Sequence, residues 1–339
     1  MTQPANPSHK GVIFSGMRPT GLLHLGNYMG ALQNWVTLQE DYSCIYCAVD
    51  IHALTTLESG EEVKDIKPNI EEMVLDWLAA GIDPEKSIVF IQSHVPEVMT
   101  LHTLLSMVTP LGWLTRVPNF KDKVRQMSET EESVNYGLVG YPVLQTADII
   151  LYKADNVPVG QDQVPHIELS REIVRRFNNM FGETFPEPQV KLTEAPLLLG
   201  LDGQHKMSKT LDNHLDLAAT PEETTKRVLT AFTDPQRLRR NDPGRPEVCN
   251  VYSLHKIFSG AEATQTVYNE CTTAARGCVD CKRHLADSIN DYLKDLRERR
   301  EEIKARTGYV QEILHEGGKR ARAIAKETIA EVYEKMGLS

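Results

Sequence analysis

The chain has 339 residues, of which 41% are hydrophobic and 25% are charged, and its formal net charge is −10. This composition is that of an ordinary folded protein, and it excludes a disordered, a collagenous or a wholly basic nucleic-acid-coating chain. No apolar run approaches the roughly 18 residues that a membrane helix needs. The first ten residues lack the apolar core of an export signal, so we expect a cytoplasmic protein with no membrane contact.

Charge is distributed unevenly along the chain. Residues 282–339 contain 13 Lys or Arg and 11 Asp or Glu, whereas residues 1–281 contain 24 and 36. A polyanionic partner would therefore be attracted to the C-terminal part. The alternative is a solvated helix surface whose charges pair with one another.

Alternating strand and helix patterns fill the first hundred residues. Apolar residues recur at helical spacing in residues 25–36 and 70–80. Three short apolar segments predict strands: residues 11–16, 44–50 and 87–92. This alternation predicts a parallel sheet of βαβ units, and therefore an α/β, Rossmann-like domain that binds its ligands at the carboxyl ends of the strands.

The sequence changes character near residues 210–216. Beyond this point strand-like segments stop, and residues 233–249 are rich in Pro, Gly, Asp and Arg, which predicts an ordered loop. Four segments have helical spacing: residues 221–232, 251–258, 284–306 and 319–336. We therefore expect an α/β domain over residues 1–212 and an all-helical domain over residues 213–339.

Two segments contain residues that suit phosphate. In residues 16–28 a glycine-bounded turn that contains His24 joins a strand to a helix, whose free N–H groups and dipole attract anions. In the loop GLDGQHKMSKT, Lys206 and Lys209 lie three residues apart, and two ammonium groups can clamp a polyphosphate during its transfer. Each segment alone has an ordinary alternative, a buried turn with a satisfied histidine or two solvated lysines.

These segments resemble two signatures of the class I aminoacyl-tRNA synthetases. PTGLLHLGN is similar to the HIGH signature, and KMSKT is similar to the KMSKS loop, with Thr210 in place of the last serine. The wider pattern resembles the bacterial-type tryptophanyl-tRNA synthetases, with FSGMRPTGLLHLGNYMGAL, VDIHALT, GIDPEKSIVFIQS, YPVLQTADIILY and VPVGQDQVPHIELSREI in matching order. The resemblance extends to the C-terminus.

The resemblance implies a Rossmann-like catalytic domain followed by an all-α anticodon-binding domain. It also implies a homodimer whose interface comes from a helical insertion at about residues 100–185. The implied partners are ATP with Mg²⁺, L-tryptophan and tRNA(Trp). In the implied reaction the tryptophan carboxylate attacks the α-phosphorus of ATP, pyrophosphate leaves, and the acyl group passes to the 3′ end of the tRNA.

The resemblance assigns catalytic roles at the phosphates to His24, Lys123, Lys206 and Lys209. For Lys123 the alternative is an exposed helix lysine. Ribose contacts are expected at residues 160–162, and Leu197 is expected to border the adenine. The complete implied ATP site is Arg18, Pro19, Thr20, Gly26, Asn27, Gly160, Gln161, Asp162, Leu197, Lys206, Met207, Ser208, Lys209 and Thr210.

A tryptophan pocket needs one acceptor in apolar surroundings, because indole offers a single N–H donor. Asp148 lies in the apolar segment YPVLQTADIILY, where an unpaired carboxylate would be costly. The resemblance implies that Asp148 accepts the indole N–H. The alternative for Asp148 is a helix-interior aspartate with a structural partner, and the alternative for His52 is a buried structural histidine. The further implied pocket residues are Phe14, Gly16, His52, Tyr141, Gln145, Val157, Val159 and Gln163.

Six cysteines fall into two groups. Cys44 and Cys47 lie in a predicted strand, where residues three apart face opposite sides of the sheet, so we expect two core thiols without a shared metal. The other four are spaced C-x21-C-x6-C-x2-C, which suggests zinc or an iron–sulfur cluster, with unrelated free thiols as the alternative. This quartet is Cys249, Cys271, Cys278 and Cys281.

A subset of the tryptophanyl-tRNA synthetases has a similar cysteine spacing, and this resemblance implies a [4Fe–4S] cluster that orders the anticodon loop. Four arginines flank the quartet and suit phosphates or bases: Arg237, Arg239, Arg240 and Arg245. Three alternatives to the whole assignment are a tyrosyl-tRNA synthetase, a nucleotidyltransferase with a HIGH-type turn, and a duplicated synthetase that serves another partner.

Overall fold

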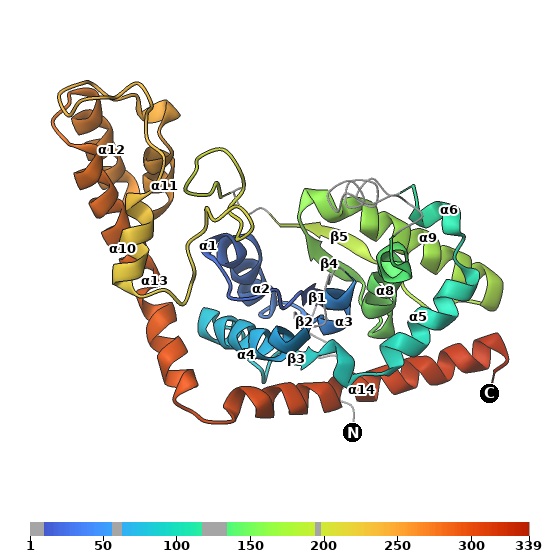
Figure 1. Ribbon diagram of the computed structural model, residues 1–339. Helices are drawn as coiled ribbons and strands as arrows, with labels where there is room; N and C mark the ends of the chain where they lie inside the picture. The colour runs from blue at the N-terminus through green and yellow to red at the C-terminus, as the bar shows by residue number, and fades with distance from the viewer. Residues whose placement is uncertain (1–9, 56–62, 117–133, 194–197, 339) are drawn as a thin grey trace.

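The computed structural model describes residues 10–55, 63–116, 134–193 and 198–338. Within these ranges five parallel strands form one sheet in the order β3-β2-β1-β4-β5. The strands are β1 (Val12–Met17), β2 (Ser43–Ala48), β3 (Ile88–Ile91), β4 (Asn156–Val159) and β5 (Gln189–Leu192). The parallel sheet confirms the predicted α/β, Rossmann-like fold (Figure 1).

Helices cover both faces of this sheet (Figure 1). One face packs against α1 (Leu25–Asn27), α2 (Gln33–Leu38) and α4 (Val63–Ala80), and a π-helical turn joins α1 to α2. The other face packs against α5 (Glu97–Val108), α8 (Tyr136–Leu151) and α9 (Val164–Phe181). Two shorter helices, α3 (Asp50–Leu54) and α6 (Leu111–Leu114), also lie in the described residues of this part.

The two cysteines of β2 belong to different cores. Cys44 lies in the cluster on the α4 side of the sheet, whereas Cys47 lies in the cluster on the α8 side. Both thiols are buried and free. The prediction that they are separate core residues is therefore confirmed.

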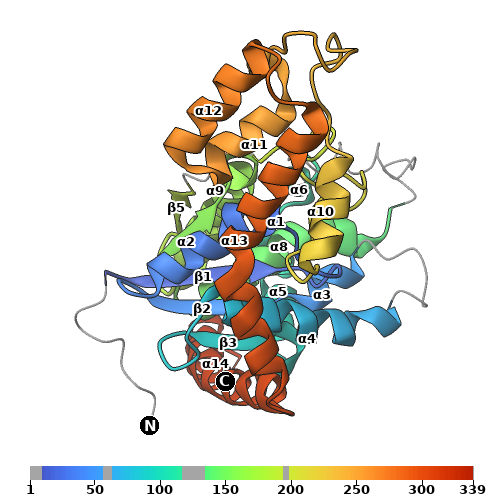
Figure 2. The same cartoon turned by 90° about the vertical axis from the view of Figure 1, so that its left-hand side faces the viewer.

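A helical arm extends from the α/β part, and the helix that follows the arm returns to the α/β part (Figures 1 and 2). The arm contains α10 (Pro221–Leu229), α11 (Asn250–Phe258), α12 (Gly260–Thr272) and α13 (Cys278–Lys304). After a turn at Gly308, α14 (Tyr309–Met336) runs along β3 and α5. None of the helices in the described ranges combines the length and apolar character of a membrane span.

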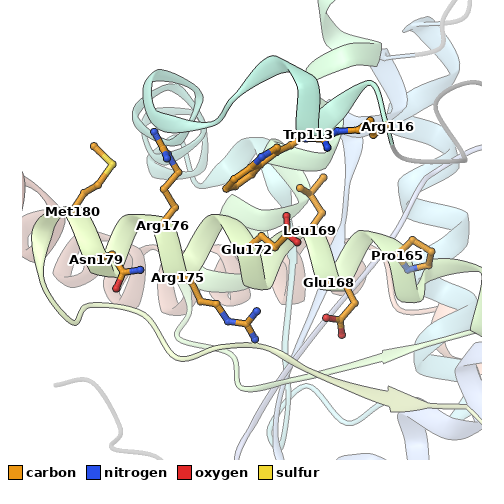
Figure 3. A pocket seen from close by; sticks show the side chains of 10 residues that line it. All are labelled: Trp113, Arg116, Pro165, Glu168, Leu169, Glu172, Arg175, Arg176, Asn179 and Met180. Atoms are coloured by element: carbon orange, nitrogen blue, oxygen red, sulfur yellow. The ribbon is translucent and has the colours of Figure 1, made fainter.

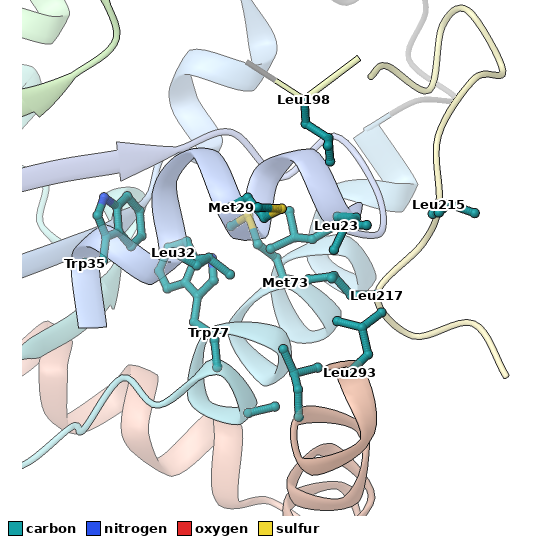
Figure 4. Packing of buried hydrophobic residues seen from close by; sticks show 14 of the residues in the cluster. Leu23, Met29, Leu32, Trp35, Met73, Trp77, Leu198, Leu215, Leu217 and Leu293 are labelled. Atoms are coloured by element: carbon teal, nitrogen blue, oxygen red, sulfur yellow. The ribbon is translucent and has the colours of Figure 1, made fainter. Parts of the chain in front are cut away.

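One apolar cluster joins the arm to the turn that contains His24. Figure 4 shows Leu23, next to this histidine, close to Met73 of α4 and to Leu217. Leu293 of α13 lies in the same cluster and is almost completely buried. The turn is therefore supported by residues from both parts of the chain.

Candidate active site

A cavity of about 450 Å³ opens at the carboxyl ends of β1 and β4. These strands are neighbours at the point where the strand order reverses, which is where open parallel sheets bind their ligands. All nine residues predicted for tryptophan line this one cavity: Phe14, Gly16, His52, Tyr141, Gln145, Asp148, Val157, Val159 and Gln163. Arg18 and Gly160, predicted for ATP, lie on its wall.

Asp148 is the buried acceptor of this cavity. Its side chain comes from α8, and the residue is 2% exposed. The Nε2 atom of Gln92 donates to both carboxylate oxygens at 2.8 Å, and the ring Nε2 of His52 lies 2.9 Å from Oδ2. These neighbours orient the carboxylate, and a carboxylate with about four lone-pair sites retains capacity for a further donor.

Gln92 is a site residue that the sequence analysis missed. It directly follows β3 and is 1% exposed, and its Oε1 accepts the backbone N–H groups of Ile51 and His52. Gln92 therefore connects the start of α3 to Asp148. Its position at the end of the predicted strand SIVFIQ was the one available signal, because such strand ends hold binding residues in parallel sheets.

Aromatic side chains form part of the cavity wall. Phe14 of β1 stacks on Tyr152 with ring centroids 5.6 Å apart. The hydroxyl of Tyr141 lies 3.2 Å from Nε2 of His166, and burial raises the pKa of Tyr141 to about 12. The neutral phenol thus stays a hydrogen-bonding group throughout the physiological range.

The two signature segments meet beside this cavity. The backbone N–H of Leu25 donates to Leu215 at 2.8 Å, and that of Leu217 donates to Leu23 at 2.9 Å. The Nζ atom of Lys209 lies 3.4 Å from the carbonyl oxygen of Thr20. The expectation that the histidine turn and the two-lysine loop lie together, although nearly 200 residues apart, is confirmed.

His24 lies at the centre of this junction and is 8% exposed. Burial above all, together with the neighbouring Lys209, His214 and Lys206, lowers the pKa of His24 to about 4. The imidazole is therefore neutral at pH 7. Gly26 allows the His24 ring and Met207 of the lysine loop to lie close to the backbone of the turn, because a methyl group at Gly26 would lie 3.0 Å from His24 Nδ1 and 3.3 Å from Met207 Cβ.

Asn213 orders the lysine loop and was also missed by the sequence analysis. Its Oδ1 accepts the N–H of Ser208 at 2.7 Å. Its Nδ2 donates to Asp202 at 2.9 Å and to the carbonyl of Lys206 at 3.3 Å. Lys206 itself stays exposed, whereas Met207 is buried beneath the loop.

The other residues that are predicted for ATP and lie in the described ranges are near the same edge of the sheet. Asn27 accepts the backbone N–H of His24 at 3.0 Å. Gln161 and Asp162 form a short 3-10 turn directly after β4. Pro19 and Thr20 belong to the loop after β1, and Thr210 is exposed at the end of the lysine loop. Lys123 and Leu197 lie outside the described residues.

Comparisons with known proteins agree with this geometry. The family model for "tRNA synthetases class I (W and Y)" matches residues 6–294. The tryptophan–tRNA ligase of Deinococcus radiodurans is 45% identical over 96% of this chain and 98% of its own length. The corresponding ligase of Thermotoga maritima is also 45% identical, over 96% of this chain and 99% of its own length. This chain belongs to the class I tryptophanyl-tRNA synthetases.

A solved structure has the same fold as this synthetase. The crystal structure of tryptophanyl-tRNA synthetase from Campylobacter jejuni, complexed with ADP and tryptophan, superposes with a TM-score of 0.86 and 34% identity. The match covers 96% of this chain and 100% of that one. The family resemblance inferred from the sequence is therefore confirmed.

The cysteine quartet of this synthetase gathers where the 233–249 loop meets α11, α12 and α13. Burial raises the pKa of the Cys249, Cys271 and Cys281 thiols, and charge on neighbouring members of the quartet contributes to each shift. All four thiols are free. In the described ranges, no three His, Cys, Asp or Glu side chains are arranged to hold a metal ion.

Two of the four arginines beside the quartet have structural partners. Arg237 donates to the carbonyl of Arg276 at 2.7 Å and lies 3.7 Å from the sulfur of Cys271. Arg245 forms an ion pair with Asp234 at 2.6 Å. The remaining two, Arg239 and Arg240, are exposed on the loop.

A second cavity, of about 820 Å³, lies between α6 and α9. Figure 3 shows Trp113 above α9, with Arg176 beside it, and the guanidinium carbon of Arg176 is 5.9 Å from the centroid of the Trp113 ring. Three apolar side chains near this cavity are exposed: Met107 by 74%, Leu111 by 65% and Met180 by 51%. They are candidates for burial by another protein surface.

Proposed function

We propose that this synthetase binds L-tryptophan in the cavity between β1, β4 and α8, and ATP at the junction of the two signature segments. It is an enzyme of the tryptophan–tRNA ligase type, as identities of 45% with ligases of this name over 96% of the chain support. The main support for the binding sites is that the nine predicted tryptophan residues line one cavity whose wall includes Arg18 and Gly160.

Recognition of the indole depends on Asp148. Gln92 and His52 hold its carboxylate in a fixed orientation at 2.8 and 2.9 Å, and the indole N–H is the donor that completes its hydrogen bonding. A phenylalanine side chain would leave the remaining acceptor capacity of Asp148 unpaired, at a cost of about 1–3 kcal/mol, so phenylalanine is disfavoured by about tenfold or more.

Activation requires attack of the tryptophan carboxylate on the α-phosphorus of ATP, with pyrophosphate as the leaving group. Lys206 and Lys209 neutralise the charge that shifts onto pyrophosphate, and His24 beside them is a hydrogen-bond donor to a phosphate oxygen. Mg²⁺ bound with ATP supplies further positive charge. In the second step the acyl group passes to the 3′-terminal adenosine of tRNA(Trp).

Pyrophosphate exchange tests this assignment directly. The wild-type protein is assayed with each of the twenty amino acids, and exchange is expected with tryptophan only. Asp148→Asn is expected to raise KM for tryptophan about tenfold or more without changing KM for ATP. Asp287→Asn, on the exposed surface of α13, is the matched control. Exchange with tyrosine would favour the tyrosyl alternative, and an unchanged KM in Asp148→Asn would remove Asp148 from the pocket.

We also propose that residues 213–339 form the anticodon-binding domain and that the cysteine quartet binds a [4Fe–4S] cluster, with zinc as the alternative. Four free thiols lie close together here, and soft thiolate ligands suit zinc or an iron–sulfur cluster. Bound there, the cluster would link the loop to α13. Arg239 and Arg240, exposed on that loop, are then the tRNA contacts.

Anaerobic purification tests the cluster. A brown protein with broad absorbance near about 400 nm is expected, because cysteine-ligated iron clusters absorb there. Cys278→Ser should lose the colour, whereas Cys44→Ala, outside the quartet, should keep it. A colourless protein with one zinc per chain would establish the alternative, and a metal-free protein would leave four ordinary thiols.

We further propose that the surface around Trp113 and α9 is the interface of a homodimer. The exposed apolar residues Met107, Leu111 and Met180 alternate there with charges of both signs, including Glu168 and Arg175, as a self-complementary surface requires. Leu111→Asp should convert a dimer into monomers in analytical ultracentrifugation. Leu238→Asp, at a side chain 86% exposed on the helical arm, should not. A monomeric wild-type protein would contradict the proposal.

A further inference from the structure

His214 is an unassigned imidazole next to His24. The backbone segment that contains it pairs with the histidine turn, and the two ring centroids are 6.0 Å apart. Within the described residues, the Nδ1 atoms of His24 and His214 are both buried without a hydrogen-bond partner. Such orphaned atoms are rare in folded proteins, because an unpaired buried polar atom costs free energy.

Asp216 orients the ring of His214. Its Oδ1 lies 3.3 Å from Nε2 of His214, within ion-pair distance, and a carboxylate at this position favours a hydrogen on that nitrogen. In the neutral ring Nδ1 then has only a lone pair and cannot donate. In the imidazolium form Nε2–H still faces Asp216, and Nδ1–H becomes a second donor that needs an acceptor.

Charged groups of both signs lie around His214. His24 faces His214 from the turn, and Lys206 and Lys209 lie on the lysine loop next to His24. From α10, Arg227 donates to the carbonyl oxygen of His214 at 3.3 Å. Asp216 is the carboxylate that faces the ring. A polyphosphate bound here would add several negative charges, and negative charge favours the imidazolium form.

We propose that His214 is a further phosphate-binding residue, which takes up a proton from solvent when a polyphosphate binds and donates Nδ1–H to a phosphate oxygen. This inference rests on the proposed binding of ATP at the same junction. Asp216 acts as a positioning residue that fixes the ring and stabilises its charge. Because the proton is gained on binding, affinity for pyrophosphate falls as pH rises through the neutral range.

Calorimetric titration with magnesium pyrophosphate measures this proton. Heats recorded at pH 7.5 in buffers of different ionisation enthalpy yield the number of protons taken up per chain. His214→Asn, which can form hydrogen bonds but cannot titrate, is expected to reduce the uptake by about 0.5 to 1 proton and to weaken binding by about tenfold at pH 6.5, with a smaller loss at pH 8.5. Asp216→Asn is expected to reduce the uptake as well.

His205→Asn is the matched control. This histidine lies on the same loop and contacts Asp202 at 3.1 Å, but its side chain is 62% exposed. Its substitution should leave proton uptake and affinity unchanged. Equal uptake in wild type, His214→Asn and the control would overturn the inference. If His214→Asn does not fold, unchanged uptake in Asp216→Asn overturns it equally.

Failure of the proposed function has a different signature. In that case the wild-type protein would bind neither pyrophosphate nor ATP, and no heat would be recorded in any buffer. Binding without a His214-dependent proton would leave the ligase assignment intact and reject only the role of His214.

Discussion

The guanidinium of Arg300 on α13 lies 2.7 Å from the carboxylate of Asp76 on α4, and both residues are almost completely buried. Glu72 contacts the same guanidinium. Burial lowers the pKa of Lys209, and the charge of Asp76 opposes that shift. The backbone of Leu23, in the histidine turn, opposes the rise that burial causes in the pKa of Asp76. One buried ion pair therefore connects the helical arm to the back of the phosphate site.

Breaking this pair should be costly. Arg300→Met leaves Asp76 buried without its partner, and we expect a loss of about 3–5 kcal/mol in the free energy of unfolding, measured by urea denaturation at pH 7.5. The double variant Arg300→Met/Asp76→Leu should recover most of that loss. Lys10→Met removes an exposed pair with Asp41 and should leave the free energy of unfolding nearly unchanged. An equally small effect of Arg300→Met would show that the pair contributes little.

Asp76 also predicts a pH dependence of stability. Burial raises the pKa of Asp76 to about 6, although Arg300 opposes the shift. The folded protein therefore keeps the proton to a higher pH than the unfolded chain does. This contribution to stability is complete below about pH 4 and disappears as pH rises through 6, a change of about 3 kcal/mol at most.

Urea denaturation of wild type and Asp76→Asn between pH 4.5 and 7 measures this contribution. The free energy of unfolding of the wild type should decline more steeply with rising pH than that of the variant. Parallel pH profiles would mean that Asp76 titrates alike in the folded and unfolded states.

Gly317 permits the contact between α14 and β3. A methyl group at this position would overlap the backbone carbonyl of Val89, whereas at Gly318 it would lie 3.4 Å from Cβ of His94, an ordinary contact. Gly317→Ala should therefore destabilise the protein by about 1–3 kcal/mol. Gly318→Ala, its matched control, should be neutral or stabilise by up to about 1 kcal/mol, since alanine favours the helix. Thermal unfolding compares the two, and similar melting temperatures would refute the close contact.

Lys209 should matter in the transition state more than in substrate binding. Lys209→Ala is expected to remove at least about 2 kcal/mol of transition-state stabilisation, a loss of about 30-fold seen mainly in kcat of pyrophosphate exchange. Lys226→Ala, on the exposed face of α10, should leave kcat unchanged. A rise in KM for ATP with kcat intact would instead assign Lys209 to ground-state binding.

Local patterns predicted part of the regular structure, whereas α5 and α9 were expected only through the helical insertion that the family resemblance implied. The three strands and the four C-terminal helices expected from periodicity are present, although α13 begins at Cys278 rather than residue 284 and α14 at Tyr309 rather than residue 319. β4 and β5 were missed because β4 contains Pro158 and no residue of β5 is buried. In α12 only Val267 is buried, so its sequence lacks a clear apolar face.

The sequence by itself determined the family, the α/β class and the two signature segments, because these depend on motifs and spacings between neighbours along the chain. The tertiary structure alone decided that Gln92 orients Asp148, that His214 lies against His24, and that a buried arginine of α13 pairs with Asp76 of α4. These contacts join residues 56 to 224 positions apart. A polar side chain at such a position has no local pattern, since its partner is supplied only when distant segments pack together and exclude water.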